Sequence, residues 1–296
     1  MTGAPSTSGV ALGAPDTPIQ VGRIVYINCY PVYGAIDRAI VPLDATIVNG
    51  VPTELNRLMA TGVLDVSVIS AVEYATDASK YLLLPDLSIS CDGPVRSVML
   101  FSKRPAHELH GRKVIVSKSS MTSVALLELL FAHVWHATPT FEPGDAEVTD
   151  IASFGDDHDA RLVIGDAALV LNAGADQGGI PKYPYVYDLG NEWKRWTGLP
   201  FVFAVWVAQR TTNVAAALQV HAQLIESRNW GIQNTAVLAQ QAHAATGVAL
   251  DVCHTYLSGL DYGMSYHHLA GLTEFFRRLV DRGRVPNGAL SFLTAA

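Results

Sequence analysis

The sequence is poor in cysteine, and this excludes the small domains that depend on disulfide bonds. Its three cysteines, Cys29, Cys91 and Cys253, are far apart and odd in number, and none stands in a C-x-x-C spacing. Neither a disulfide framework nor a zinc site is therefore expected. Reduced thiols of this kind are typical of a protein in the cytoplasm.

Long apolar runs are also lacking. No segment approaches the roughly 18 consecutive apolar residues of a membrane-spanning helix, so no membrane contact is expected. The first twenty residues are rich in Gly, Ala, Pro, Ser and Thr, without the basic start and apolar centre of a signal peptide. We expect residues 1–20 to form a disordered tail and the protein to be cytoplasmic.

Charge is scarce and its balance is negative. Charged residues make up 16% of the chain, and 20 basic against 27 acidic residues give a net charge of −7. This balance argues against nucleic acid as a partner, and equally against an anionic membrane surface. It leaves room for a small anionic ligand, because a few local hydrogen-bond donors can bind an anion whatever the net charge.

Sequence motifs of metal and nucleotide sites are missing as well. The ten histidines include the pairs 107/110, 133/136 and 267/268, yet no pair has a third ligand at a suitable spacing. The segment G-A-D-Q-G-G at 174–179 is expected to be a loop, since it lacks the strand-linked glycine spacing of a dinucleotide-binding motif. The chain shows no Walker motif and no Ser-His-Asp arrangement. We therefore expect no metal and no cofactor.

What the sequence does contain is a regular alternation of two patterns. The chain has 296 residues, 49% of them hydrophobic, and short β-branched runs alternate with helical periodicity. This predicts an α/β protein with a large core. Strands are expected at 23–29, 46–51, 65–70, 81–91, 95–101, 113–116, 161–164 and 185–189. Helices are expected at 53–61, 71–78, 121–135, 191–196, 212–228, 229–246, 251–258 and 264–282.

The order of these patterns indicates that one lobe is inserted into another. The pattern restarts near residue 105 and returns to an apolar strand near residue 200. Residues 21–103 together with 201–296 are expected to form a first lobe, and residues 104–200 a second. Two connections, near 101–106 and 198–202, join them, and the cleft between such lobes is a common place for a small ligand.

The most informative single segment is T-G-L-P-F-V-F-A-V-W-V-A-Q at 197–209. A Gly-Leu-Pro turn precedes alternating aromatic and β-branched residues, which predicts a buried strand that begins at Phe201. Taken by itself, the pattern gives Phe201 the role of a core side chain.

A cluster of hydroxyl side chains surrounds the expected start of the helix at 121–135. The segment V-S-K-S-S-M-T-S at 116–123 holds four serines and one threonine. Free backbone N–H groups and the positive end of the helix dipole make it a candidate site for a carboxylate or a phosphate. The candidate residues are Ser119, Ser120, Thr122 and Ser123. Ordinary N-capping by one serine is the alternative, and it explains a single hydroxyl.

Two further polar residues follow or precede expected strands. Asn28, in I-V-Y-I-N-C-Y-P-V at 24–32, has an amide that can donate and accept hydrogen bonds. The alternative is a turn residue whose side chain bonds its own backbone. Ser97 follows the turn D-G-P at 92–94 and begins a strand that leads toward the second lobe.

Strand-to-helix junctions give the remaining candidates. Ser70 and Glu73 lie in I-S-A-V-E-Y at 69–74, where the glutamate is expected to orient the helix. Asp166, in R-L-V-I-G-D-A-A-L at 161–169, begins a helix after a strand. It is suited to an N-cap role and also to a hydrogen bond with a substrate hydroxyl, and the two roles are compatible.

Taken together, these blocks resemble the chorismate dehydratase family of menaquinone biosynthesis. The most specific similarities lie at 23–34, 65–74, 81–102, 117–130, 161–169 and 187–206. The resemblance implies a periplasmic-binding-protein-like (type II) fold with an inter-domain cleft. It also implies a hydro-lyase that converts chorismate into 3-[(1-carboxyvinyl)oxy]benzoate, the entry step of the futalosine route. Such an enzyme needs no organic cofactor and no metal.

The residues expected in the site follow from the motifs and the resemblance together. Asn28 and Ser97 are the predicted catalytic residues. The predicted substrate contacts are Ser70, Ser119, Ser120, Thr122, Ser123, Asp166 and Phe201. Because no histidine lies in the matching cleft blocks, we hypothesise that the enolpyruvyl carboxylate of chorismate is itself the base.

Two other functions are compatible with the same fold. A non-catalytic binding protein for a small anionic solute is one, although the chain shows no signal peptide or lipid-attachment cysteine near its first residues. The sister enzyme that forms dihydroxynaphthoate is the other, and the N-terminal and G-L-P-F-V-F-A blocks match it less well.

Overall fold

The computed structural model describes residues 18–145, 148–149, 154–155, 157–178 and 182–295, with the side chains of 175–178 left aside. Of the tail expected at 1–20, residues 1–17 lie outside the described residues. Ile19 and Gln20, which the same expectation included, belong to the first strand. The expected loop at 174–179 is wrong for 174–178, because these residues continue a helix that begins at Gly165.

The first of two five-stranded sheets has the order β2-β1-β3-β10-β4. Its strands are β1 (Ile19–Ile24), β2 (Ala45–Gly50), β3 (Val66–Ser70), β4 (Tyr81–Cys91) and β10 (Phe201–Gln209). Strands β1, β2 and β3 are parallel, whereas β10 runs antiparallel to both of its neighbours. Its helices are η1 (Ile27–Cys29), α1 (Tyr30–Tyr33), α2 (Pro52–Ala60), α3 (Ala71–Thr76), α7 (Val214–Gln233), α8 (Thr235–Thr246), α9 (Leu250–Ser258) and α10 (Tyr266–Asp281).

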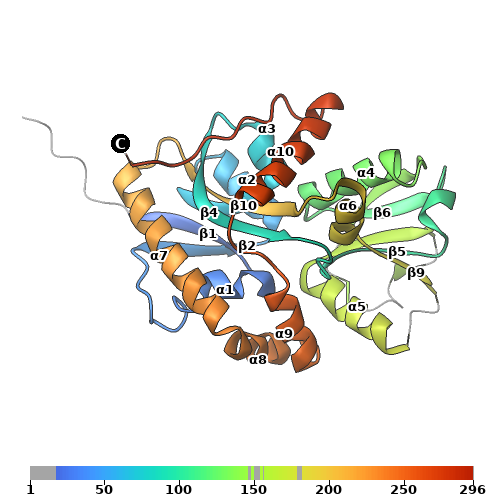
Figure 1. Cartoon of the computed structure of the whole chain (residues 1–296), viewed down its shortest axis with the longest axis horizontal. Coiled ribbons are helices and arrows are strands. Elements are labelled where there is room, and N and C mark those ends of the chain that lie inside the picture. Colours follow the sequence, from blue (N-terminus) through green and yellow to red (C-terminus); the bar gives the residue numbers. More distant parts are fainter. Residues whose placement is uncertain (1–17, 146–147, 150–153, 156, 179–181, 296) are drawn as a thin grey trace, which may run out of the picture.

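The second sheet has the order β7-β6-β8-β5-β9. Its strands are β5 (Val98–Ser102), β6 (Lys113–Ser117), β7 (Thr140–Gly144), β8 (Ala160–Ile164) and β9 (Tyr185–Asp188). The helical segments that accompany it are η2 (Ala106–Glu108), α4 (Met121–His133), α5 (Gly165–Gly178) and α6 (Leu189–Thr197). The two sheets with their helices lie side by side, the second drawn in green and yellow (Figure 1). The predicted α/β fold is confirmed.

The chain passes between the sheets twice. The first passage lies between Cys91 and Val98, earlier than the expected 101–106, because β5 pairs with β8 and β9 of the second sheet. The expected division at residue 103 therefore falls after a strand that already belongs to the second sheet. The second passage lies between Thr197 and Phe201, after Gly198 ends α6 in the left-handed conformation with φ 74°.

Asp188 fixes the first passage. Its carboxylate accepts hydrogen bonds from the backbone N–H groups of Val95 (3.0 Å) and Arg96 (2.7 Å), and it caps α6 through Asn191 N–H (3.0 Å). Burial raises the pKa of this carboxyl, and the backbone hydrogen bonds oppose that rise. Arg96 has a positive φ of 61°, so these hydrogen bonds hold a conformation that a non-glycine residue rarely adopts.

Replacing Asp188 by alanine is expected to lower the free energy of unfolding by about 2–3 kcal/mol, because buried N–H groups lose a charged acceptor. Urea denaturation followed by circular dichroism measures the change. Asp92→Ala is the matched control in the same passage, since its ion pair with Lys194 lies at the surface and stabilises little. Equal losses in the two variants would contradict the anchoring role of Asp188.

The core is centred on β10, which lies between β3 and β4 and is buried from Phe201 to Ala208. Such a continuous apolar run is typical of a strand that is covered on both faces. The ring of Phe201 packs edge-on against Trp193, Phe203 and Phe275, at centroid distances of 5.2, 4.6 and 4.8 Å. The predicted buried strand is confirmed, and it supplies the aromatic centre of the molecule.

Two local differences from the expected elements matter for the site. Strand β1 ends at Ile24, where its partner β2 also ends, so the expected strand at 23–29 is wrong beyond that residue. Asn28 consequently lies in the short helix η1 rather than at a strand end. Strand β7 was not expected at all, because Pro143 interrupts its pattern, and proline is tolerated there at the edge of the sheet.

Candidate active site between the two sheets

Four strand ends define the candidate site. In the first sheet the parallel neighbours β1 and β3 lead into η1 and α3, and in the second the parallel neighbours β6 and β8 lead into α4 and α5. Ligands of open α/β sheets bind outside the carboxyl ends of such strands. The helix starts at these ends also present backbone N–H groups without partners in their own helix.

The first junction between the sheets joins the starts of η1 and α5. Asp166 accepts a hydrogen bond from Ile27 N–H, at 3.1 Å to Oδ1 and 3.4 Å to Oδ2. The N–H of Gly165 donates to the carbonyl oxygen of Ser97 at 2.8 Å. Gly165 has φ 64°, and a Cβ atom there would lie 3.0 Å from the ring of Tyr26, so a larger residue would not fit. The structure thus brings Asn28, Ser97 and Asp166 into one junction.

Asn28 carries an unsatisfied group within this junction. Its Oδ1 atom is buried and accepts no hydrogen bond from any residue in the described part of the chain. A turn asparagine that bonds its own backbone would not leave this oxygen unused. A buried acceptor without a donor is unfavourable by about 1–3 kcal/mol, which makes Asn28 a candidate ligand contact. The neighbouring Cys29 thiol is not a nucleophile, because burial raises its pKa to about 12.

Ser97 is almost fully buried, at 4% exposure, and its side-chain hydroxyl has two hydrogen-bond contacts among the described residues. Its Oγ accepts from the hydroxyl of Tyr256 at 2.9 Å. Its own proton reaches the carbonyl oxygen of Val95, at a long 3.4 Å. Sequence patterns did not indicate Tyr256, which lies in an ordinary amphipathic helix 159 positions away.

The second junction joins the starts of α3 and α4. Thr122 Oγ1 accepts a hydrogen bond from Val72 N–H at 3.1 Å, so a side chain of α4 caps α3 across the sheets. Ser70 caps the same helix by accepting from Glu73 N–H at 3.1 Å. The Nδ2 group of Asn56 also donates to Ser70 Oγ at 3.1 Å. The two predicted residues of this junction, Ser70 and Thr122, therefore both cap the start of α3.

The serine cluster at the start of α4 is largely paired within itself. Ser120 is the N-cap, accepting from Ser123 N–H at 3.2 Å and donating to Ser123 Oγ at 2.8 Å. Ser119 N–H donates to Ser117 Oγ at 2.9 Å. Ordinary capping thus explains Ser120, whereas Thr122 bonds across the junction. The anion-binding role of this cluster stays a prediction.

Phe201 begins β10, where the chain re-enters the first sheet, and its predicted contact with the substrate stays a prediction. Its side chain is 1% exposed and enclosed by the aromatic cluster of the core, so the structure gives it a packing role.

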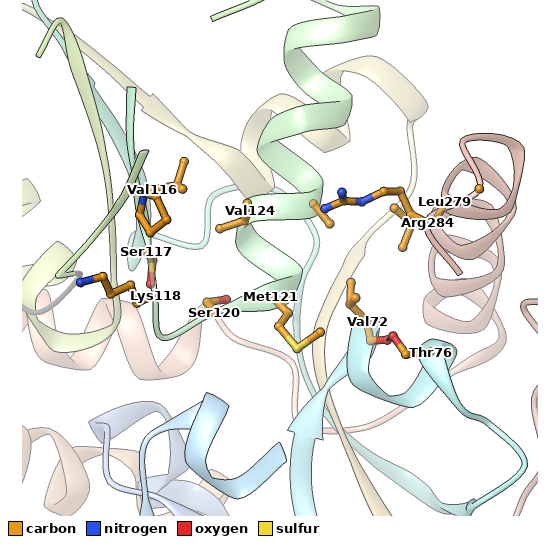
Figure 2. A pocket seen from close by; sticks show the side chains of 13 residues that line it. Val72, Thr76, Val116, Ser117, Lys118, Ser120, Met121, Val124, Leu279 and Arg284 are labelled. Carbon is orange, nitrogen blue, oxygen red and sulfur yellow. Dashed lines mark hydrogen bonds between the residues drawn. The ribbon is translucent and has the colours of Figure 1, made fainter. Parts of the chain in front are cut away.

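A hollow of about 590 Å³ opens beside the second junction. Figure 2 shows Lys118 and Arg284 toward its two sides, with Met121 and Val124 between them. Its other lining residues are Val72, Thr76, Val116, Ser117, Ser120, Ala125, Pro143, Leu279 and Gly283. Because these residues come from both sheets, the hollow changes shape whenever the two parts of the molecule move relative to each other.

Comparison with known proteins identifies the group to which these features belong. A family model described as menaquinone biosynthesis matches residues 19–281. The chain belongs to this menaquinone biosynthesis family. It is 32% identical over 243 residues to the chorismate dehydratase of Thermus thermophilus, covering 79% of this chain and 86% of that one. The chorismate dehydratase of Campylobacter jejuni is 29% identical over 188 residues, or 62% of this chain and 64% of the relative.

Comparison with solved structures shows that this chain has a periplasmic-binding-protein-like fold. Protein AF1704 of Archaeoglobus fulgidus superposes with a TM-score of 0.70 at 19% identity, covering 90% of this chain and 98% of that one. The alkanesulfonate-binding protein SsuA of Xanthomonas axonopodis, bound to MOPS, gives a TM-score of 0.65 at 13% identity, with 94% and 97% covered. At these identities the likeness concerns the fold, and it confirms the fold expected from the family resemblance.

Two features of the described residues of this chain bear on other classes of function. None of its helices in that part is both long enough and apolar enough to cross a membrane. Likewise, no group of three or more His, Cys, Asp or Glu side chains among those residues is placed to hold a metal ion.

Replacing Thr122 by valine is expected to lower kcat/KM by roughly tenfold. The N–H of Val72 loses its acceptor at the second junction, so α3 and α4 are no longer held together there. Steady-state kinetics with chorismate measures the effect. Thr76→Val is the matched control, since that hydroxyl only donates to the Val72 carbonyl within α3. An unchanged kcat/KM in Thr122→Val would sink the assignment of this residue to the site.

Proposed function

We propose that this chain is a chorismate dehydratase, a hydro-lyase that converts chorismate into 3-[(1-carboxyvinyl)oxy]benzoate. The observation that carries the proposal is the 32% identity to the Thermus thermophilus chorismate dehydratase over 86% of that protein. The family match at 19–281 includes every residue of both junctions. We place the reaction at the two junctions because they bring together the strand ends of both sheets.

The chemistry of the junctions suits a dianionic substrate. Chorismate has a ring carboxylate and an enolpyruvyl carboxylate, and each needs hydrogen-bond donors. The first junction offers the hydroxyl of Ser97 and the Nδ2 group of Asn28 as donors, whereas the Oδ1 atom of Asn28, which has no donor among the described residues, can accept a hydrogen bond from the substrate hydroxyl. The backbone N–H groups of Ile27 and Val72 are already bonded to Asp166 and Thr122, so these two side chains border the site and the N–H groups are not open donors.

The proposed reaction uses the substrate's own enolpyruvyl carboxylate as the base. The C–H bond at the ether-bearing ring carbon breaks, its proton passes to that carboxylate, and the electron pair is delocalised into the ring carboxylate. The resulting carboxylic acid returns the proton to the departing hydroxyl, which leaves as water, and the ring becomes aromatic. Positioning of the base and of the charged ring supplies most of the rate, as expected for an intramolecular proton transfer.

Each residue of the first junction has a part in this scheme. Asn28 and Ser97 hold the enolpyruvyl carboxylate at the ring proton, and donors at the ring carboxylate stabilise the charge that develops there. Asp166 is placed to accept a hydrogen bond from the substrate hydroxyl. A second carboxylate at Asn28 would repel the base, which makes an uncharged amide the suitable side chain.

The proposed reaction also indicates the pathway and the cellular compartment in which the protein acts. Dehydration of chorismate is the entry step of the futalosine route to menaquinone, and we assign the chain to that step. We infer a cytoplasmic location, in agreement with three buried cysteines that form no disulfide.

Incubation with chorismate tests the proposal directly. We expect a product that is lighter by one water and that shows the ultraviolet spectrum of a substituted benzoate. Mass spectrometry and absorbance measure both properties, with a sample without protein as the control for spontaneous decay. Binding of chorismate without any loss of water would instead indicate a solute-binding protein.

A further inference from the structure

Tyr256 is a buried tyrosine whose hydroxyl contacts Ser97 of the first junction. It lies on α9, its side chain is 1% exposed, and its hydroxyl donates to Ser97 Oγ at 2.9 Å. Burial raises the pKa of Tyr256 far above its usual range, and the nearby Asp166 carboxylate raises it further. The hydroxyl consequently keeps its proton near neutral pH, and it remains a donor.

This donor decides which way the Ser97 hydroxyl points. A serine hydroxyl has one proton to give and two lone pairs to accept with. Tyr256 uses a lone pair, so the serine proton is directed elsewhere. The acceptor it finds within the described structure is the carbonyl oxygen of Val95, two residues back and 3.4 Å away. At this distance the hydrogen bond is weak, so a better acceptor can replace it readily.

Resting on the proposed function, we infer that Tyr256 is a positioning residue that holds Ser97 as a hydrogen-bond donor to a substrate carboxylate. Without Tyr256, the serine hydroxyl can rotate and can turn a lone pair toward a substrate hydroxyl. With Tyr256 donating to it, the serine proton points away from the tyrosine and is available to an oxygen acceptor such as a carboxylate. A hydrogen bond received by a hydroxyl also strengthens the one that it donates.

The backbone around Ser97 supports the same role. Its carbonyl oxygen is held by Gly165 N–H at 2.8 Å, and the preceding residues 95–96 are held by the Asp188 carboxylate. The main chain is thus fixed from two sides, and the side-chain torsion is the one freedom left at Ser97. Tyr256, on α9, removes that freedom by donating to Ser97 Oγ.

A double-mutant cycle of Tyr256→Phe and Ser97→Ala tests the inference with chorismate as substrate. We expect Tyr256→Phe to lower kcat/KM by roughly tenfold, as for the loss of one hydrogen bond. The loss should fall on kcat more than on KM, because a misoriented base slows proton transfer. In the Ser97→Ala background, Tyr256→Phe should have no further effect within about twofold.

Tyr183→Phe is the matched control. Tyr183 is also fully buried, and its hydroxyl forms a hydrogen bond with His158 Nε2 at 3.0 Å in the core of the second sheet, away from both junctions. Its removal should leave kcat/KM unchanged, which separates the loss of any buried tyrosine hydroxyl from the loss of this one. All variants are assayed well below the lowest of their melting temperatures, and binding of the benzoate product by calorimetry gives a second readout that needs no turnover.

The outcomes separate this inference from the proposed function. If Tyr256→Phe lowers kcat/KM equally in the wild-type and in the Ser97→Ala background, Tyr256 acts on folding and the inference is overturned. An unchanged kcat/KM in Tyr256→Phe overturns it too. If wild-type protein does not dehydrate chorismate, the proposed function fails instead, and the same cycle on the dissociation constant of chorismate still decides whether Tyr256 acts through Ser97.

Discussion

Asn28→Asp should slow the dehydration of chorismate by roughly a thousandfold, because two carboxylates about 4 Å apart repel each other by about 4 kcal/mol near a protein surface. Asn28→Ala should lower the rate by roughly tenfold to a hundredfold, since it only removes hydrogen bonds to a charged group. The order of the two variants follows from the proposed base, which is itself an anion. Values of kcat and KM with purified variants measure the difference.

Asn213→Asp is the matched control for the same chemical change. Asn213 is exposed, its Oδ1 accepts from Ala216 N–H at 3.1 Å at the start of α7, and an aspartate caps a helix equally well there. It should leave turnover unchanged. If Asn28→Asp were fully active and added its own limb to the pH–rate profile, the protein would be supplying a base at position 28. The substrate-assisted mechanism would then be wrong.

A large effect on stability is expected from Gly271→Ala. A Cβ atom at Gly271 of α10 would lie 2.1 Å from the carbonyl oxygen of Pro200, in the passage that leads into β10. The backbone has to shift, because neither group is the end of a flexible side chain. We expect a loss of about 3 kcal/mol or more in unfolding free energy, at the upper end for overpacking. Thermal and urea denaturation measure it.

Gly174→Ala gives the opposite result for the same substitution. Gly174 lies within α5, and a Cβ atom there meets no heavy atom of the described residues within 4 Å. Alanine should therefore stabilise the helix by up to about 1 kcal/mol. If Gly271→Ala were as stable as wild type, the close approach of α10 to Pro200 would not be a requirement of the fold.

Local patterns were sufficient to predict most of the fold. The apolar alternation of β10 and the periodicity of the C-terminal helices are properties of neighbouring residues, and these elements formed, although the boundary expected at 228/229 is wrong because α7 continues to Gln233 and α8 begins at Thr235. The errors concern pairing partners that are distant in sequence. Whether residues 98–102 join the first or the second sheet depends on β8 and β9, and the end of β1 depends on where β2 ends.

Prediction of the site from the sequence is limited even more by contacts between residues that are distant along the chain. Strand-end positions and family resemblance pointed to Asn28, Ser97 and Asp166, and contacts across 139 residues bring them together. The serines before α4 could not be sorted by sequence, because capping within the helix and bonding across the cleft use the same residue types. Tyr256 has no local pattern that marks it, since the hydrogen bond that gives it a role is with Ser97, in another part of the chain.

The place of β10 within the first sheet has a consequence for how the protein is made. On the ribosome, β1 to β4 emerge first, but β3 and β4 are not joined into one sheet until β10 has been synthesised between residues 201 and 209. The second sheet, from β5 to β9, is contiguous in sequence and is complete before β10 appears. Because segments fold as they become available during translation, the inserted unit is the first to finish. The part of the chain that was made earliest therefore waits longest for its own central strand.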